Sequence, residues 1–309
     1  MHDIILHHYP QSPVAEKVRI VFGIKDLEWR SVIIPRLPPK PDLMPLSGGY
    51  RQTPVMQIGA DVYCDSQCII RELERRFPEP SLFPGGSQGM AWGVSRWTDE
   101  PLFNNVIAVV FAAPIEAMPA QFVEDRLPLY FHSGIHIEDF QTCLPELLAS
   151  LRAQFGWMDD RLANRKFMLG AQPGLPDALA YYLVWFLRGR YCQGPKFLSE
   201  FSHLNRWEAD MAGIGHGRTV ETTAEQALVA ALSAETTSVA GIEPFEVQDL
   251  RPGQAVRVAP DNGSASIAGQ LLALSRDEVI LSHHHQRVGD VAIHFPRVGY
   301  RIKPDARDA

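Results

Sequence analysis

The stretch that decides the fold reads YRQTPVMQIGADVYCDSQCII, residues 50–70. An apolar run at 55–58 leads through the turn Gly59-Ala60-Asp61 into a second run that ends at Cys64, which predicts a tight β-hairpin. Pro54 stands at the start of the first run and has no N–H for a strand ladder. It is therefore either an edge residue or a cis proline, and the backbone of Thr53 can then pair with a bound peptide.

A helix is predicted directly after the hairpin. Apolar residues recur at 68, 69, 70, 73 and 77 among charged ones, which is the spacing of an amphipathic helix. Asp65 and Ser66 open this segment, where side-chain oxygens cap unpaired backbone amides. A carboxylate and a hydroxyl are therefore expected at a helix N-terminus.

The residues before this stretch complete a β-α-β-β-α pattern. An apolar run at 3–8 predicts a strand, helical spacing follows from Val14 to Gly23, and 29–34 supplies a second strand. Ser12 followed by Pro13 suits an N-cap and the first helical position. A strand, a crossover helix and a strand form a right-handed parallel unit.

These motifs resemble the N-terminal domain of glutathione transferases over about residues 3–84. The resemblance implies a thioredoxin-like α/β fold. It also implies that Thr53 and Pro54 pair with the cysteinyl part of glutathione, and that Asp65 and Ser66 hold its γ-glutamyl end. The plain alternative for these residues is a strand proline and an ordinary cap.

Ser12 is the catalytic candidate. Only the thiolate of glutathione is a competent nucleophile, and a helix N-terminus with a fixed hydroxyl stabilises an anion. The start SPVAEKVRI resembles that of the serine-dependent transferase classes. Two readings stay open: Tyr9 could take the catalytic role, or Ser12 could be a cap alone. Arg51 or Lys40 is expected to reach the glycyl carboxylate.

The chain after residue 84 shows two further patterns. A Gly/Pro/Ser cluster at 84–87 predicts a linker, and residues 88–240 carry helical spacing. The segment around Asp177 resembles the capping motif of the family's sixth helix, although Gly174 replaces the usual hydroxyl residue. Trp97, Phe103 and Phe111 could line an apolar pocket, but such spacing is more typical of core.

Short strand-type runs separated by turns fill residues 243–309. Spacing near ten residues predicts a small β-barrel or sandwich module. The expected domains are therefore 1–84, thioredoxin-like; 88–240, an all-helical bundle; and 243–309, all-β.

Composition excludes several classes of function. The chain has 29 basic and 36 acidic residues, so it lacks the basic surplus that nucleic-acid binding needs. The N-terminal apolar run is too short for a signal sequence or a membrane span, and we expect a cytoplasmic protein. Four cysteines show no zinc spacing, three adjacent histidines at 283–285 cannot converge on one ion, and no metal is expected.

The resemblance implies a homodimeric detoxification enzyme that activates glutathione, its co-substrate, for attack on an apolar electrophilic small molecule. A second hypothesis is a non-catalytic protein that binds glutathione or another ligand and uses its β-module for partner contacts. A third is a glutathione-dependent reductase, which would depend on Cys64.

Overall fold

A computed structural model describes residues 2–112, 119–131, 134–261 and 266–305. These residues form two compact units. The first unit is drawn from the segments Met1–Val18, Glu28–Arg76 and Arg218–Ala309, and the second from Arg19–Leu27 and Phe77–Gly217.

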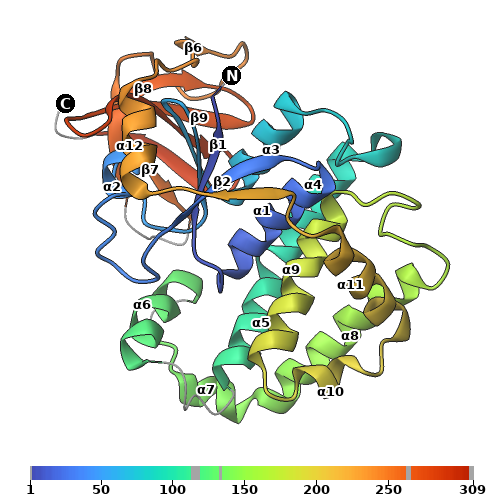
Figure 1. Ribbon diagram of the computed structural model, residues 1–309. Helices are drawn as coiled ribbons and strands as arrows, with labels where there is room; N and C mark the ends of the chain where they lie inside the picture. The colour runs from blue at the N-terminus through green and yellow to red at the C-terminus, as the bar shows by residue number, and fades with distance from the viewer. Residues whose placement is uncertain (1, 113–118, 132–133, 262–265, 306–309) are drawn as a thin grey trace. The chain divides into compact units, whose positions relative to one another are not determined.

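The first unit contains the predicted thioredoxin-like sheet (Figure 1). Strand β1 (Ile4–His8) pairs parallel with β2 (Glu28–Ile33) and antiparallel with β3 (Val55–Ile58). Strand β4 (Asp61–Cys64) closes the predicted hairpin with β3. The thioredoxin-like fold class is confirmed.

Helices cover both faces of this sheet. The crossover helix is α1 (Pro13–Ile24), and α3 (Ser66–Arg76) follows β4. Tyr63 points from β4 toward α3, where its hydroxyl donates to a Glu72 carboxylate oxygen at 3.0 Å. Its strand neighbours face the other way, because side chains alternate along a strand. On that other face lies α2 (Met44–Ser47), a short helix.

The predicted C-terminal β-module is present as five strands: β7 (Ala255–Pro260), β8 (Ile267–Leu274), β9 (Glu278–His285), β10 (Gly289–Pro296) and β11 (Tyr300–Pro304). These appended strands continue the thioredoxin-like sheet, because β10 pairs parallel with β4. Among the described residues the strand order is β11-β7-β8-β9-β10-β4-β3-β1-β2-β5. One sheet thus contains both the N-terminal strands and the C-terminal strands (Figure 1).

Two further strands and one helix complete the first unit: β5 (Arg218–Glu221), β6 (Gly241–Ile242) and α12 (Ala224–Leu232). Strand β5 pairs with β2, and β6 with β8. Helix α12 buries Ala227, Leu228 and Ala231 in the same apolar cluster as Val62 of β4 and Phe295 of β10. A single core therefore supports the thioredoxin-like strands and the appended strands.

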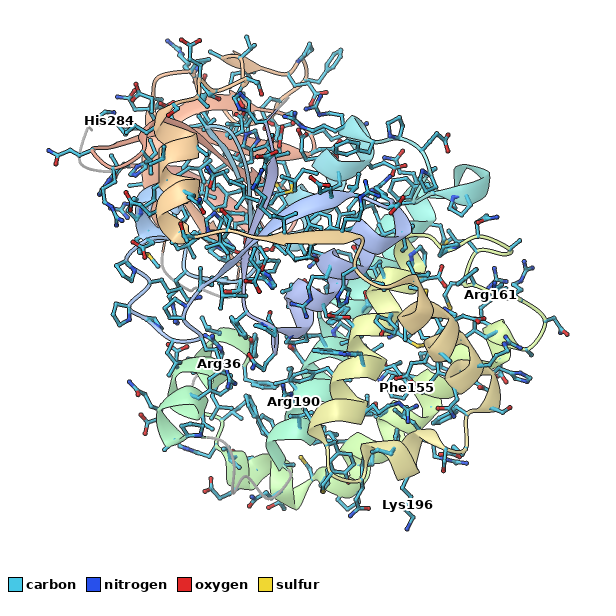
Figure 2. All side chains as sticks on the ribbon, viewed as in Figure 1. Arg36, Phe155, Arg161, Arg190, Lys196 and His284 are labelled. Atoms are coloured by element: carbon cyan, nitrogen blue, oxygen red, sulfur yellow. The ribbon has the colours of Figure 1, made fainter. Side chains whose placement is uncertain are left out.

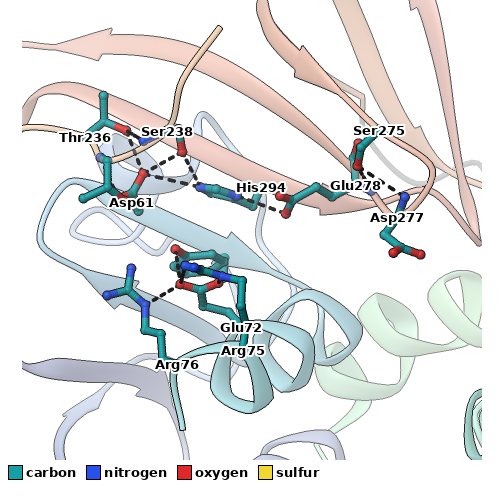
Figure 3. Close-up of polar contacts among 12 residues, drawn as sticks. Asp61, Glu72, Arg75, Arg76, Thr236, Ser238, Ser275, Asp277, Glu278 and His294 are labelled. Atoms are coloured by element: carbon teal, nitrogen blue, oxygen red, sulfur yellow. Dashed lines mark hydrogen bonds and ion pairs between the residues drawn. The ribbon is translucent and has the colours of Figure 1, made fainter. Parts of the chain in front are cut away.

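A buried carboxylate lies at the start of β4 (Figure 3). Asp61 accepts hydrogen bonds from the hydroxyls of Thr236 and Thr237, both at 2.6 Å, and from the Ser238 hydroxyl at 2.9 Å. His294 of β10 lies 3.4 Å from Asp61 and 3.2 Å from Glu278 of β9. The Asp61 network ties β4 to the segment after α12 and to the appended strands.

The second unit is helical, as predicted. Its helices are α4 (Gln88–Thr98), α5 (Pro101–Ala112), α6 (Ala120–Tyr130), α7 (Ile137–Thr142), α8 (Leu144–Leu162), α9 (Leu175–Arg190), α10 (Gly194–Leu198) and α11 (Ser202–Ile214), after a 3-10 turn at Pro84–Gly86. Phe155, labelled in Figure 2, is fully buried and meets the rings of Phe197 and Phe201, both at 6.2 Å between centroids. No helix of the described residues has the length and apolar composition needed to cross a bilayer.

The start of α9 explains the glycine that departs from the family motif. Asp177 accepts the Gly174 N–H at 2.9 Å, and its other oxygen accepts from the Met168 N–H and the Trp207 indole, both at 2.8 Å. A Cβ at position 174 would lie 2.8 Å from the Leu82 carbonyl oxygen. The close approach of the two backbones therefore requires glycine at this cap.

The aromatic residues considered for an apolar pocket differ in burial. Phe103 and Phe111 are buried on α5, and Phe103 packs against the ring of Tyr182. Trp97 is partly exposed, and its indole N–H donates to Gln154 at 2.8 Å. Phe103 and Phe111 are therefore core residues of the second unit.

Candidate functional site

Three connecting segments leave the same end of the thioredoxin-like sheet. His7 near the end of β1 pairs with Val55 at the start of β3, and Val55 pairs with Cys64 at the end of β4. The segment after β1, the segment before β3 and the segment after β4 therefore lie side by side at this end of the sheet. They carry Tyr9 and Ser12; Arg51, Thr53 and Pro54; and Asp65 and Ser66.

Ser12 caps α1, as predicted. Its Oγ accepts the Ala15 N–H at 3.1 Å, and its carbonyl accepts the Glu16 N–H at 3.0 Å. The oxygen is the acceptor in the first contact, so the hydroxyl can still donate its proton. The Ser12 residue is only 2% exposed.

Tyr9 lies at the base of the same segment. Its carbonyl accepts the Ser12 N–H at 3.1 Å, and its ring belongs to the buried apolar cluster of the first unit. The Arg36 guanidinium lies 5.9 Å from the ring centroid, within the range of a cation–π contact. The ring of Tyr9 thus packs in the core and supports the loop that holds Ser12.

Lys40 organises the segment before β3. Its ammonium donates to the Arg51 carbonyl at 2.7 Å and to the Thr53 hydroxyl at 2.9 Å. Lys40 is 2% exposed, and the Thr53–Pro54 peptide bond is cis. The structure therefore brings Lys40, Arg51 and Thr53 together and places the Lys40 ammonium next to the Arg51 carbonyl and the Thr53 hydroxyl.

Asp65 and Ser66 open α3, as predicted. Asp65 Oδ1 accepts the Gln67 N–H at 2.8 Å, which is an N-cap bond. Asp65 has a φ of 76°, in the left-handed region that aspartate tolerates better than most residues. Its side chain is partly exposed, whereas Ser66 is 5% exposed.

Two residues that sequence reasoning missed touch this pair. Lys17 of α1 is buried, and its ammonium donates to Ser66 Oγ at 3.0 Å. The Tyr300 hydroxyl of β11 donates to Asp65 Oδ2 at 3.2 Å. Lys17 follows Ser12 by little more than one helical turn, which could have marked it, but no local signal connects Tyr300 to this site.

The site is electropositive. The ammonium groups of Lys17 and Lys40 are buried there, and Arg51 adds a third cation. The N-termini of α1 and α3 add partial positive charge and unpaired amides. The carboxylate of Asp65 lies among them. Such a site suits a ligand that carries several anionic groups and one ammonium group.

The buried cysteines near this site are poorly suited to redox chemistry. Cys64 is fully buried and Cys68 is 2% exposed. Burial, followed by the negative charge of Asp65, raises the pKa of the Cys64 thiol well above its ordinary value. Because the thiolate is the reactive form, a thiol held protonated is a weak nucleophile.

The three adjacent histidines lie at the end of β9. His284 points outward, as Figure 2 shows, and its Nδ1 lies 2.8 Å from an Asp290 carboxylate oxygen. Among the described residues, no group of three or more His, Cys, Asp and Glu side chains is arranged to hold a metal ion.

Comparisons with known families match both parts of the chain. The model of the glutathione S-transferase N-terminal domain matches residues 6–81, and that of the C-terminal domain matches residues 141–210. No curated protein sequence matches the chain.

Solved structures give whole-chain and partial matches. A GST-like protein from Pseudomonas syringae is 30% identical with a TM-score of 0.78, and the match covers 99% of this chain and 100% of that one. Poplar glutathione transferase F1 is 11% identical with a TM-score of 0.52, covering 69% and 93%. FzlA from C. crescentus is 19% identical with a TM-score of 0.52, covering 68% and 87%. The last two matches show the fold, whereas the first also extends over the appended strands.

Proposed function

Because this chain belongs to the glutathione S-transferase family, we propose that it joins the sulfur of glutathione to an electrophilic carbon of an apolar small molecule. The observation that carries this proposal is the meeting of three segments at one end of the sheet, two of which begin helices. Glutathione has two carboxylates, one ammonium group and an ionisable thiol, which suit the charges of this site.

Ser12 is the proposed catalytic residue. Its hydroxyl donates to the glutathione sulfur while its oxygen keeps the bond from the Ala15 N–H. The α1 N-terminus favours the same negative charge. Lowering the thiol pKa by about 2 units requires about 2.7 kcal/mol, which one hydroxyl donor and a helix end can supply together. The thiol proton passes to solvent, the thiolate attacks the carbon, and the leaving group departs with its bonding electrons.

The remaining residues hold the peptide. The Thr53 backbone next to Pro54 pairs with the cysteinyl unit, and Lys40 fixes that segment through its bonds to Arg51 and Thr53. The Arg51 side chain attracts the glycyl carboxylate, and the Lys40 ammonium adds its charge next to the Arg51 carbonyl.

The γ-glutamyl end is bound at the start of α3. Asp65 takes its ammonium group, and the Ser66 hydroxyl takes its carboxylate. Lys17 supports the second contact with a positive charge 3.0 Å from Ser66 Oγ. Tyr9 supports the Ser12 loop through its carbonyl.

We propose a cytoplasmic homodimer as the working form.

Two measurements test this proposal. Wild-type protein is expected to be retained on immobilised glutathione and to conjugate glutathione to a chlorinated dinitrobenzene with release of chloride. Ser12→Ala is expected to lower kcat by about 10²-fold, the usual cost of removing one donor to a developing anion. Retention of the variant should stay close to that of wild type, and its unfolding free energy should fall by only about 1 kcal/mol, the usual cost of losing a serine N-cap. Equal turnover by Ser12→Ala and wild type would remove Ser12 from the mechanism.

One observation favours a second candidate, a glutathione-binding protein without turnover. Ser12 is 2% exposed and already serves as a helix cap, so its hydroxyl has a structural role that needs no thiol. Retention on glutathione without chloride release by the wild-type protein would favour this candidate over the enzyme.

A further inference from the structure

Tyr300, the first residue of β11, reaches across the core to the residue that caps α3. Its hydroxyl donates to Asp65 Oδ2 at 3.2 Å, over a separation of 235 positions in the sequence. The other carboxylate oxygen accepts the Gln67 N–H at 2.8 Å. We infer that Tyr300 is a positioning residue for the γ-glutamyl end of glutathione, so the appended strands complete the peptide site. This inference rests on the proposed function.

Two aromatic residues, Phe295 and Tyr50, pack around Tyr300. The ring of Phe295 on β10 contacts the rings of Tyr300 and Tyr50, at centroid distances of 5.8 and 5.9 Å. The hydroxyls of Tyr50 and Tyr300 are 3.3 Å apart. The single proton of the Tyr300 hydroxyl goes to Asp65, because a carboxylate can only accept. The Tyr50 hydroxyl can then donate to Tyr300 or to Gln52 Oε1, which lies 3.5 Å away.

Both tyrosines keep their protons at neutral pH. Burial, followed by the negative charge of Asp65, raises the pKa of Tyr50 well above its ordinary value. Burial also raises the pKa of Tyr300, with Tyr50 and Asp65 adding to the effect. The donation to Asp65 is therefore kept over the pH range in which the protein is assayed.

A second contact fixes the same part of the appended strands to α3. The turn that joins β10 to β11 contains Val298, whose carbonyl accepts from the Gln67 side-chain amide at 3.3 Å. Gln67 thus touches Asp65 with its backbone and the turn with its side chain. Strand β11 is in turn paired with β7 from Tyr300 to Pro304. The hydroxyl of Tyr300 is therefore presented from a strand rather than from a loose tail.

The consequence is specific to one end of the ligand. A carboxylate held at both oxygens keeps one orientation, so an incoming ammonium group meets a preorganised acceptor. Without the Tyr300 hydroxyl the Asp65 carboxylate can turn, which weakens its grip on the γ-glutamyl ammonium. Contacts to the cysteinyl and glycyl units, made by other segments, are left as they were.

The experiment compares two peptides by isothermal titration calorimetry: glutathione, and cysteinylglycine, which lacks the γ-glutamyl residue. Tyr300→Phe is expected to raise the Kd for glutathione about tenfold, the usual cost of losing a hydrogen bond to a charged group. The Kd for cysteinylglycine should change less than about twofold. In turnover assays the same variant should raise KM for glutathione and leave kcat unchanged, as expected for loss of binding made equally in ground and transition states.

Tyr63→Phe is the matched control. Tyr63 is also buried, its hydroxyl also donates to a carboxylate, Glu72, at 3.0 Å, and it lies on β4 next to the same site. Tyr63 bonds to Glu72 on the face of the sheet that α3 covers, whereas Tyr300 packs on the other face. The Kd values of Tyr63→Phe for glutathione and for cysteinylglycine should therefore stay close to those of wild type. In an Asp65→Asn background, Tyr300→Phe should have no further effect on glutathione binding.

The outcomes separate the two proposals. If wild-type protein does not bind glutathione, the proposed function fails, and this inference fails with it. If wild-type protein binds and Tyr300→Phe leaves the ratio of the two Kd values unchanged, only the inference fails. Should Tyr300→Phe not fold, Tyr50→Phe decides: it removes the hydroxyl 3.3 Å from that of Tyr300 and should shift the same ratio in the same direction, by about twofold to threefold.

Discussion

Asp61 and Asp65 stand at the two ends of β4, four positions apart, and appended strands hold both, yet the two carboxylates have different surroundings. Asp61 is fully buried and accepts from three consecutive residues of the segment after α12. Asp65 is partly exposed and is gripped by a neighbouring amide and by the Tyr300 hydroxyl. The same type of side chain belongs to a buried network at one end of the strand and to the proposed ligand site at the other.

The charge of Asp61 is stabilised where it lies. Burial raises the pKa of Asp61, but the hydrogen bonds from His294, Thr236 and Thr237 outweigh burial and hold the pKa well below its ordinary value. Burial lowers the pKa of His294, but Asp61 and Glu278 outweigh it and raise the pKa overall. Each shift favours the charged form of its own residue. A carboxylate with so many protein donors has little capacity left for a ligand.

The largest expected effect is on stability at Asp61. Asp61→Asn replaces an acceptor oxygen with an amide N–H₂ group and removes the negative charge that pairs with His294. Breaking a buried pair of this kind costs about 3–5 kcal/mol of unfolding free energy, measured by urea denaturation. Asp65→Asn makes the same chemical change four residues away, where asparagine caps a helix as well as aspartate does. It should cost less than about 1 kcal/mol. Equal losses in the two variants would end the distinction between the two carboxylates.

The converse effect is on binding at Asp65. Asp65→Asn removes the charge that faces the ligand ammonium, so the Kd for glutathione should rise about tenfold to hundredfold, as for a hydrogen bond between charged groups. Asp61→Asn, studied where it remains folded, should keep the wild-type Kd. Calorimetric titration of both variants at one temperature checks this. A larger binding loss in Asp61→Asn than in Asp65→Asn would contradict the assignment.

The helix caps and the appended strands could be predicted from local sequence. Ser12 and Asp65 were found from the sequence because an N-cap depends on the few residues that follow it, and Ser12 with Ala15 and Asp65 with Gln67 confirm that both residues are caps. The strands from residue 255 onward were also predicted, because alternation and turns are local. Caps and strand runs of this kind can be predicted because each depends on residues that are close together in the sequence.

The long-range half was not predictable in this way. The pairing of β10 with β4 joins Ala292 to Asp61, and no local pattern encodes which distant strand lies beside which. The contact of Tyr300 with Asp65 depends on that pairing, as does the burial of His294. The structure also buries Lys17 against Ser66, a contact between residues 49 positions apart. Sequence reasoning therefore identified the caps and missed the groups that support them.

A smaller effect should appear in the pH dependence of stability. The folded-state pKa of His294 is raised, so its contribution is fully present below about pH 6.5, the ordinary histidine value, and is lost as pH rises through the folded value. The pKa of Asp61 is lowered, so its contribution is present above about pH 4 and is lost in more acidic solution. Wild-type unfolding free energy should therefore decline on the alkaline side of neutrality.

His294→Gln is the variant that isolates this term. Glutamine can still donate to Asp61 or Glu278 but does not titrate, so the alkaline decline should flatten while overall stability falls. Urea midpoints measured from pH 6 to pH 9 for both proteins give the comparison. An alkaline slope that is the same in His294→Gln and in wild type would assign the decline to other groups.

The smallest expected effect is the loss of unfolding free energy when one of the hydroxyl donors to Asp61 is removed. The Ser238 hydroxyl donates to Asp61 at 2.9 Å and lies 3.2 Å from His294 Nε2, so it bridges the two charges. Ser238→Ala should lower the unfolding free energy by only about 1 kcal/mol, because the bonds from Thr236 and Thr237 stay in place. Ser233→Ala, at an exposed position shortly before, is the control and should change stability by less than about 0.5 kcal/mol. A loss in Ser238→Ala as large as that in Asp61→Asn would mean that the bridge itself, rather than the number of donors, keeps the carboxylate charged.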